Sequence, residues 1–176
     1  MSTFSETQKA LRLWLLVILA VSWCGFMIFS FVALKQQLVD GIPFGDKPMP
    51  DNMLIVFVII INVVFMFLEA MVILLKLDVS IDKYGISYSY FPFIGKKTIA
   101  KDDIQFAFVR NYRAIKEYGG WGYRKMRRSK ALNVWGKWGI QIITKKGKYL
   151  LLGTQKPKEV SAVLESLGYE KLSPKN

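Results

Sequence analysis

The sequence of 176 residues contains no histidine. Histidine is the commonest general base and the commonest metal ligand in enzymes, so its absence removes both kinds of chemistry together. The glycine-rich segments lack the Lys-Ser/Thr ending of a phosphate-binding P-loop. Asp102 and Asp103 are adjacent, so on a strand their carboxylates would face opposite sides. We therefore expect no enzymatic activity, no metal site and no cofactor.

Cysteine and acidic residues are also scarce. The single cysteine, Cys24, cannot form a disulfide within the chain, which fits a reducing compartment for the C-terminal part. Lysine and arginine total 25 against 13 acidic residues, a formal net charge of +12. From Lys76 onward the counts are 21 against 8, and before it 4 against 5, so the basic balance belongs to the C-terminal part.

A long apolar run covers residues 53–75, and 17 of its 23 residues are Leu, Ile, Val or Phe. A helix of that length rises roughly 34 Å, enough to cross a hydrocarbon core of about 30 Å. Its apolar side chains favour insertion by about 7 kcal/mol, whereas Glu69 opposes it by about 3 kcal/mol. We predict a transmembrane helix that passes at Lys76, without a linker, into a strand pattern beginning at Leu77.

Residues 13–34 form a first apolar run without a charge. A signal peptide is the alternative, but this run is longer than the usual apolar region of 7 to 15 residues and ends without a small-residue cleavage site. We therefore predict a retained transmembrane helix between an N-terminal tail, 1–12, and an extracytoplasmic loop, 35–52, rich in glycine and proline. Lysine and arginine near the spans favour cytoplasmic N- and C-termini.

Three polar side chains border or interrupt the two runs: Arg12, Asn62 and Glu69. Glu69 lies seven residues before Lys76, roughly 10 Å from the exit side of a helix. We favour an ion pair with Arg12 or a carboxylate that reaches the surface, the alternative being a proton or ion relay. Asn62 is expected to hydrogen-bond between helices, within the chain or across a homodimer.

From residue 77 the apolar period changes to two, as in half-buried strands. Residues 157–167 then return to a helical period, with Pro157 in the first turn and Gly168 after the end. We predict an α+β membrane protein with a domain at residues 77–168 and a tail at 169–176. The seven expected strands cover residues 77–82, 86–90, 96–100, 104–112, 131–135, 139–144 and 149–153.

Three segments of this domain resemble the pleckstrin-homology-like (PH-like) domains that follow paired transmembrane helices in small bacterial membrane proteins. They are the hairpin 77–90, the segment Tyr118-Gly119-Gly120-Trp121-Gly122-Tyr123-Arg124, and Gly153-Thr154-Gln155 leading to Pro157 and Glu159. The resemblance implies a curved, partly open seven-stranded β-barrel capped by the C-terminal helix. It also implies a family whose members mostly lack an assigned activity.

The connection between the fourth and fifth expected strands is basic and aromatic, with Glu117 as its one acid. Such a segment beside a membrane is typical of contact with anionic headgroups, and the alternative is a solvated hairpin. We find no nucleic-acid-binding signature. The candidate contact residues are Arg110, Arg113, Lys116, Trp121, Arg124, Lys125, Arg127, Arg128 and Lys130.

These observations predict a membrane-anchored PH-like module for binding or scaffolding. Its expected partner is another membrane protein, a second copy of the chain, or anionic lipid contacted by residues 110–130. The alternative function is that of an accessory subunit of a transporter or membrane complex, acting through Arg12, Asn62 and Glu69.

Overall fold

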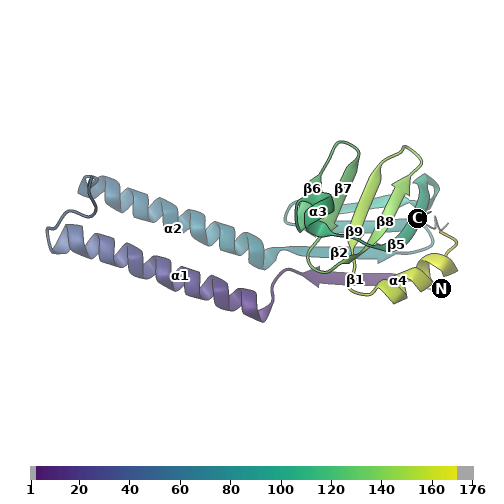
Figure 1. The fold of residues 1–176 in the computed structure, drawn as a ribbon, viewed down its shortest axis with the longest axis horizontal. Coiled ribbons are helices and arrows are strands. Elements are labelled where there is room, and N and C mark those ends of the chain that lie inside the picture. Colours follow the sequence, from purple (N-terminus) through teal and green to yellow (C-terminus); the bar gives the residue numbers. More distant parts are fainter. Residues whose placement is uncertain (1–2, 170–176) are drawn as a thin grey trace. The chain divides into compact units, whose positions relative to one another are not determined.

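The computed structural model describes residues 3–169, and the chain divides into two compact units (Figure 1). The helical unit comprises Leu11–Ile73. The sheet unit comprises the residues up to Ala10 together with those from Leu74 onward. The helical unit is therefore inserted between two segments of the sheet unit, and we describe each unit separately.

The helical unit contains α1 (Leu13–Leu34) and α2 (Asp51–Leu74). A π-helical turn, η1 (Lys35–Val39), continues α1, so the connection expected from residue 35 is helical at its start. Both helices are long and apolar enough to cross a membrane, which is in itself weak evidence that they do so.

A few side chains join the two helices. Phe65 of α2 stacks against Trp23 and Phe26 of α1, with ring centroids 6.1 and 5.3 Å away. Most of the remaining large apolar side chains are exposed, among them Leu13, Phe31 and Phe67. An exposed apolar surface of this extent marks a site of contact with a membrane or with another protein.

Within residues 3–169 the sheet unit holds nine strands in two sheets (Figure 1). The first sheet is antiparallel and contains, in order, β1 (Phe4–Lys9), β2 (Lys76–Ile81), β3 (Gly85–Phe91) and β4 (Ile94–Ala100). A short 3-10 turn, η2 (Lys101–Asp103), leads to the second sheet. Its order is β5 (Ile104–Asn111), β8 (Trp138–Thr144), β9 (Tyr149–Gly153), β7 (Ser129–Asn133) and β6 (Gly122–Lys125).

The expected seven-stranded barrel was wrong in two respects. Neither sheet closes into a barrel, and two strands, β1 and β6, were not predicted. The strand β1 lies in the segment expected to be a tail. It was not predicted because Phe4 is its one apolar side chain and its other buried positions, Glu6 and Gln8, are polar. The seven predicted strands are confirmed, with ends shifted by two residues at most.

The core lies between the facing surfaces of the two sheets. Leu77, Val79 and Ile81 alternate inward along β2 and belong to the same buried cluster as Ile140 and Ile142 of β8. Strands of the second sheet cross those of the first at a steep angle in Figure 1. The core is thus that of a two-layered sandwich.

The helix α4 (Pro157–Ser166) covers one edge of this core, as predicted. Val160 and Leu164 are buried, and the helix packs against β1, β5 and β8. Tyr169, expected in the tail, is buried as well, and its hydroxyl donates to Asp82 O at 3.2 Å. The rest of the predicted tail, 170–176, lies outside the described residues.

The N-terminal strand is held by the segment Gly153-Thr154-Gln155. The buried Glu6 carboxylate accepts from Thr154 Oγ1 at 2.7 Å and from Gln155 N at 2.8 Å. Gln8 Nε2 donates to Gly153 O at 2.7 Å. Glu6 and Gln8, the polar residues that interrupt the apolar pattern of β1, therefore hold this strand in the fold through their hydrogen bonds.

Candidate functional site

The basic, aromatic connection is largely ordered secondary structure. The short helix α3 (Ala114–Tyr118) follows β5 and ends at Gly119, whose φ of 71° is left-handed and favours glycine. The strand β6 then pairs with β7 in an antiparallel hairpin. The nine candidate contact residues consequently lie in three different places.

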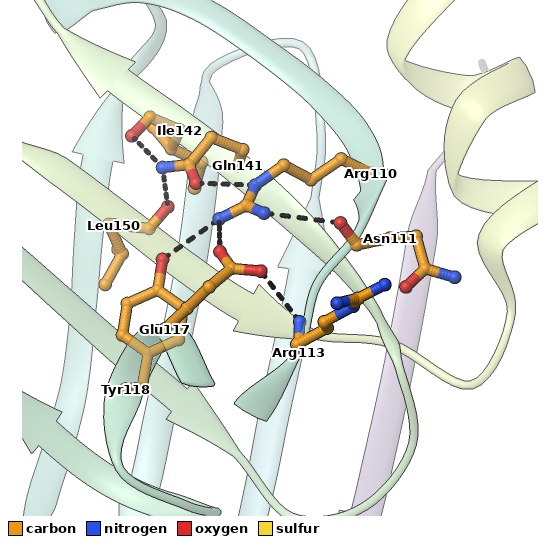
Figure 2. A network of polar contacts seen from close by, with 8 residues as sticks. All are labelled: Arg110, Asn111, Arg113, Glu117, Tyr118, Gln141, Ile142 and Leu150. Atoms are coloured by element: carbon orange, nitrogen blue, oxygen red, sulfur yellow. Dashed lines mark hydrogen bonds and ion pairs between the residues drawn. The ribbon is translucent and has the colours of Figure 1, made fainter. Parts of the chain in front are cut away.

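Arg110 lies in a polar network on the outer surface of the second sheet (Figure 2). Its Nε donates to Gln141 Oε1 at 3.1 Å, and its Nη2 contacts Glu117 Oε2 at 2.8 Å. The same Nη2 donates to Tyr118 Oη at 3.1 Å. The Arg110 side chain is thus engaged in holding α3 against the sheet.

Glu117 completes this network. Its second oxygen accepts from the backbone N–H of Arg113, at the start of α3, at 2.7 Å. Partial burial raises the pKa of Glu117, but the hydrogen bonds from Arg110 and Arg113 outweigh this effect, so the net pKa lies below its ordinary value. The carboxylate is therefore charged at neutral pH and offsets the charge of Arg110.

Buried aromatic side chains lie beneath α3. The rings of Tyr112 and Tyr118 meet edge to face, with centroids 6.2 Å apart. Burial raises the pKa of Tyr112 to about 12. These tyrosines therefore belong to a small buried core under α3.

Four of the nine residues lie around two shallow hollows. Arg113, Lys116 and Trp121 line one hollow of about 630 Å³. Trp121 also borders a second, of about 280 Å³, together with Arg124. Aromatic and aliphatic side chains make up much of both linings.

The remaining four candidates lie around one larger hollow of about 690 Å³, here called the basic groove. The turn between β8 and β9 adds two further cations to its lining, and Tyr88 and Ile99 of the first sheet border it too. None of the described residues that line it is acidic. Its six cationic side chains are Lys125, Arg127, Arg128, Lys130, Lys146 and Lys148.

The parallel pairing of β7 with β9 creates the basic groove. Ser129 pairs with Tyr149, and Tyr149 N donates to Arg128 O at 2.9 Å. The β6–β7 turn and the β8–β9 turn consequently lie side by side. Gly147, with a φ of 69°, closes the second turn in a conformation that favours glycine.

Lys146 and Lys148 were missed by the sequence analysis. They lie between the predicted strands 139–144 and 149–153, in a connection that is visibly basic. Nothing in the period of those strands shows that β9 lies beside β7. Predicting that these lysines lie in the groove would have required knowledge of the β7–β9 pairing. The other four cations of the groove were predicted as candidates for ligand contact.

The groove is suited to an anion. None of its six cations forms a salt bridge with another described residue. Burial raises the pKa of Tyr88, and the nearby Tyr123 raises it further. The Tyr88 phenol therefore keeps its proton and can donate a hydrogen bond into the groove. Arginine can bind a phosphate or carboxylate through two parallel hydrogen bonds.

The polar residues of the apolar helices lie within the helical unit. Asn62 Nδ2 donates to Ser30 Oγ of α1 at 3.3 Å and to Val58 O at 2.8 Å, so the expected interhelical bond forms within one chain. Glu69 Oε1 accepts from Ser22 Oγ of α1 at 3.5 Å. An ion pair between Arg12 and Glu69 stays a prediction.

No family model, curated protein or solved structure matches this chain. The resemblance to PH-like domains therefore stays a prediction. The case for a functional site rests on the basic groove and its unneutralised charge.

Proposed function

We propose that the protein is a membrane-anchored binding module of PH-like architecture. In this proposal α1 and α2 span a bilayer, and the basic groove binds the phosphate of an anionic lipid headgroup at the membrane face. The observation that carries the proposal is the gathering of six cations around one groove without an acidic residue among its described lining. The sandwich capped by α4 supports the architectural part.

The pairing of β1 with β2 supports retention of both helices and a topology with both termini on one side of the membrane. Lys9 pairs with Lys76 in the same sheet, and the helices lie between them in sequence. If the helices span a membrane, both ends of the pair must return to the same face. Removal of α1 as a signal sequence would also remove β1, which precedes it. Lysine and arginine at these ends favour the cytoplasmic face of a bacterial inner membrane.

Several features favour a lipid headgroup as the ligand. The groove, at about 690 Å³, has the size of a small-molecule site, typically ~300–1,000 Å³. A module tethered to a bilayer meets headgroups at high effective concentration. An acidic segment of a neighbouring membrane protein has related charge, so the experiment must separate the two ligands.

Lipid retention by the full chain tests the proposal. The protein is purified in neutral detergent, offered equal amounts of phosphatidylglycerol and phosphatidylcholine, and examined by native mass spectrometry. The groove variant combines Lys125→Gln, Arg127→Gln and Lys146→Gln. Because each cation near an anionic surface contributes about 1 kcal/mol, we expect about a hundredfold loss of preference for phosphatidylglycerol.

A matched variant controls for net charge. Lys96→Gln, Lys97→Gln and Lys158→Gln remove the same charge from exposed positions outside the groove. This control should keep the lipid preference. An equal loss of lipid preference in both variants would show that the preference depends on net charge and not on the groove. Crosslinking of the full chain in its membrane separates the second ligand. If the groove variant keeps its lipid preference but no longer crosslinks to another membrane protein, that protein is the ligand of the groove.

A further inference from the structure

A second surface of the sheet unit surrounds the point where the chain leaves it and returns. Ala10 N donates to Leu75 O at 2.9 Å, so the outgoing and incoming segments lie side by side. Lys76, the next residue, pairs with Phe91 at the end of β3. The turn between β3 and β4 therefore lies at this same end of the first sheet.

Two exposed phenylalanines come from that turn. Phe91 is 46% exposed and Phe93 is 58% exposed. The ring of Phe93 stacks on buried Tyr90, with centroids 6.3 Å apart. Phe93 is thus held in place on one side while its other side is open to the surroundings.

The second sheet contributes two tryptophans to the same end. Trp135 Nε1 donates to Ala10 O at 2.9 Å, and its ring lies 6.5 Å from that of Trp121. Trp121 Nε1 donates to Gly136 O at 3.3 Å, and its side chain is 42% exposed. Because both indole N–H groups donate to backbone oxygens, the exposed part of Trp121 is mainly apolar ring.

These side chains form one continuous surface. Leu75, Phe93, Trp121 and Arg124 border one hollow, and Trp121 shares the next with Ile115, which is 66% exposed. Clustered apolar side chains of this kind mark interaction sites, unlike single exposed ones. We call the residues Leu75, Phe93, Ile115, Trp121 and Arg124, which border these two hollows, the exit surface.

The exit surface is separate from the basic groove. Strand β6 begins at the exit surface with Gly122 and ends at the groove with Lys125. The two surfaces also differ in chemistry, since aromatic and aliphatic side chains dominate the first and cations the second.

We infer that the exit surface lies in the headgroup–acyl boundary of the bilayer spanned by α1 and α2. Aromatic rings with a few cations have the composition favoured at that boundary. The chain allows little separation, because α2 ends at Leu74, directly before the exit surface. On the other side two residues separate Ala10 from Leu13, the start of α1, a span of about 10 Å when extended. The inference rests on the spanning helices of the proposed function and is independent of the groove.

Spin labels on the full chain in phosphatidylcholine–phosphatidylglycerol liposomes test this inference. In a Cys24→Ser background, single labels are attached through Phe93→Cys or Ile115→Cys. The control is Tyr84→Cys, an aromatic position 71% exposed at the opposite end of the first sheet. We expect Phe93 and Ile115 labels to be relaxed by dissolved oxygen and shielded from a water-soluble nickel chelate, and the Tyr84 label to show the reverse.

Two results would overturn the inference. Phe93 and Ile115 labels as accessible to the chelate as the Tyr84 label would show a surface in water. Labels shielded from both oxygen and the chelate would show a protein, or a second copy of the chain, on this surface. Failure of the groove proposal is distinguishable, because the groove variant would then keep its lipid preference while the Phe93, Ile115 and Tyr84 labels show the expected accessibilities.

Discussion

Thr154 is a single hydroxyl that joins two parts of the chain distant in sequence. It donates to the Glu6 carboxylate at 2.7 Å and accepts from Lys156 N, beside the start of α4, at 3.1 Å. Glu6 is only 7% exposed, and a buried carboxylate is costly unless donors surround it. The free energy of unfolding should therefore depend on this hydroxyl more than on hydroxyls at the surface.

Replacement of the hydroxyl by a methyl group measures this dependence. Thr154→Val leaves one oxygen of Glu6 without its donor, so we expect the free energy of unfolding to fall by about 1–3 kcal/mol. The control, Thr98→Val, removes an exposed hydroxyl that contacts Ser87, and should change it by less than about 0.5 kcal/mol. Urea unfolding of the full chain in detergent, followed by tryptophan fluorescence, provides the measurement. Equal effects would contradict a structural role for the Glu6 contacts.

Glu117 gives a prediction that depends on pH. Its pKa is lowered from 4.5 in the folded chain, so the unfolded chain binds the proton more readily. Its contribution to stability is therefore complete above about pH 4.5 and is lost as pH falls through the lower, folded pKa. Because Glu117 is partly exposed, we expect Glu117→Gln to reduce the free energy of unfolding by only about 0.5 kcal/mol at pH 7.

This difference between Glu117→Gln and the unsubstituted chain should shrink on acidification. Urea unfolding of both proteins at pH 7 and at pH 3 measures it. A difference that is the same at both pH values would show that the carboxylate charge does not stabilise α3.

At the scale of elements, β1 and β2 form a hairpin whose connection is the entire helical unit. Lys9 pairs with Lys76, and Ala10 N donates to Leu75 O at 2.9 Å. Two strand ends in this register can be joined by a two-residue turn. The helical unit should consequently be removable without disturbing either sheet.

We predict that joining Ala10 to Leu75 through Asn-Gly gives a sheet unit that folds on its own. Circular dichroism and cooperative urea unfolding would measure this. The comparison is a fragment of residues 77–176. It lacks β1, and with it Glu6, which accepts the hydrogen bond from Thr154, so it should unfold without cooperativity. If both fragments unfold alike, β1 contributes little to the fold.

How far the sequence predicts this fold depends on the information that each element carries. The bounds of α1, residues 13–34, follow directly from an uncharged run between Arg12 and Lys35. Strands with alternating apolar residues were likewise predictable. The strand β1 was not, because its buried positions hold Glu6 and Gln8, whose donors and acceptors are contributed by residues almost 150 positions away.

The same limit applied to the candidate site. Composition pointed to Lys125, Arg127, Arg128 and Lys130, and the structure places these around one groove. Composition could not distinguish them from Arg110, whose charge is offset by Glu117. Which cations lack an acidic partner is decided by strand pairing, which a period of two does not specify.

For the whole molecule, the fold constrains topology more strongly than the charge pattern does. Four basic residues flank the predicted cytoplasmic ends against two in the connecting loop, a modest difference for the positive-inside rule. The pairing of β1 with β2 is independent of charge. It requires residues before α1 and residues after α2 to be on the same side of any membrane that the helices cross.

Labelling with a membrane-impermeant maleimide tests this topology in cells. In a Cys24→Ser background, we expect Asp46→Cys, in the connection between α1 and α2, to react in intact cells. Thr3→Cys and Lys158→Cys, on exposed positions before α1 and after α2, should react only after permeabilisation. If Thr3→Cys and Lys158→Cys both react in intact cells, the orientation is the reverse of the predicted one, with the two termini still on one side. Reaction of one without the other would contradict the β1–β2 pairing, since strands on opposite sides of a bilayer cannot hydrogen-bond.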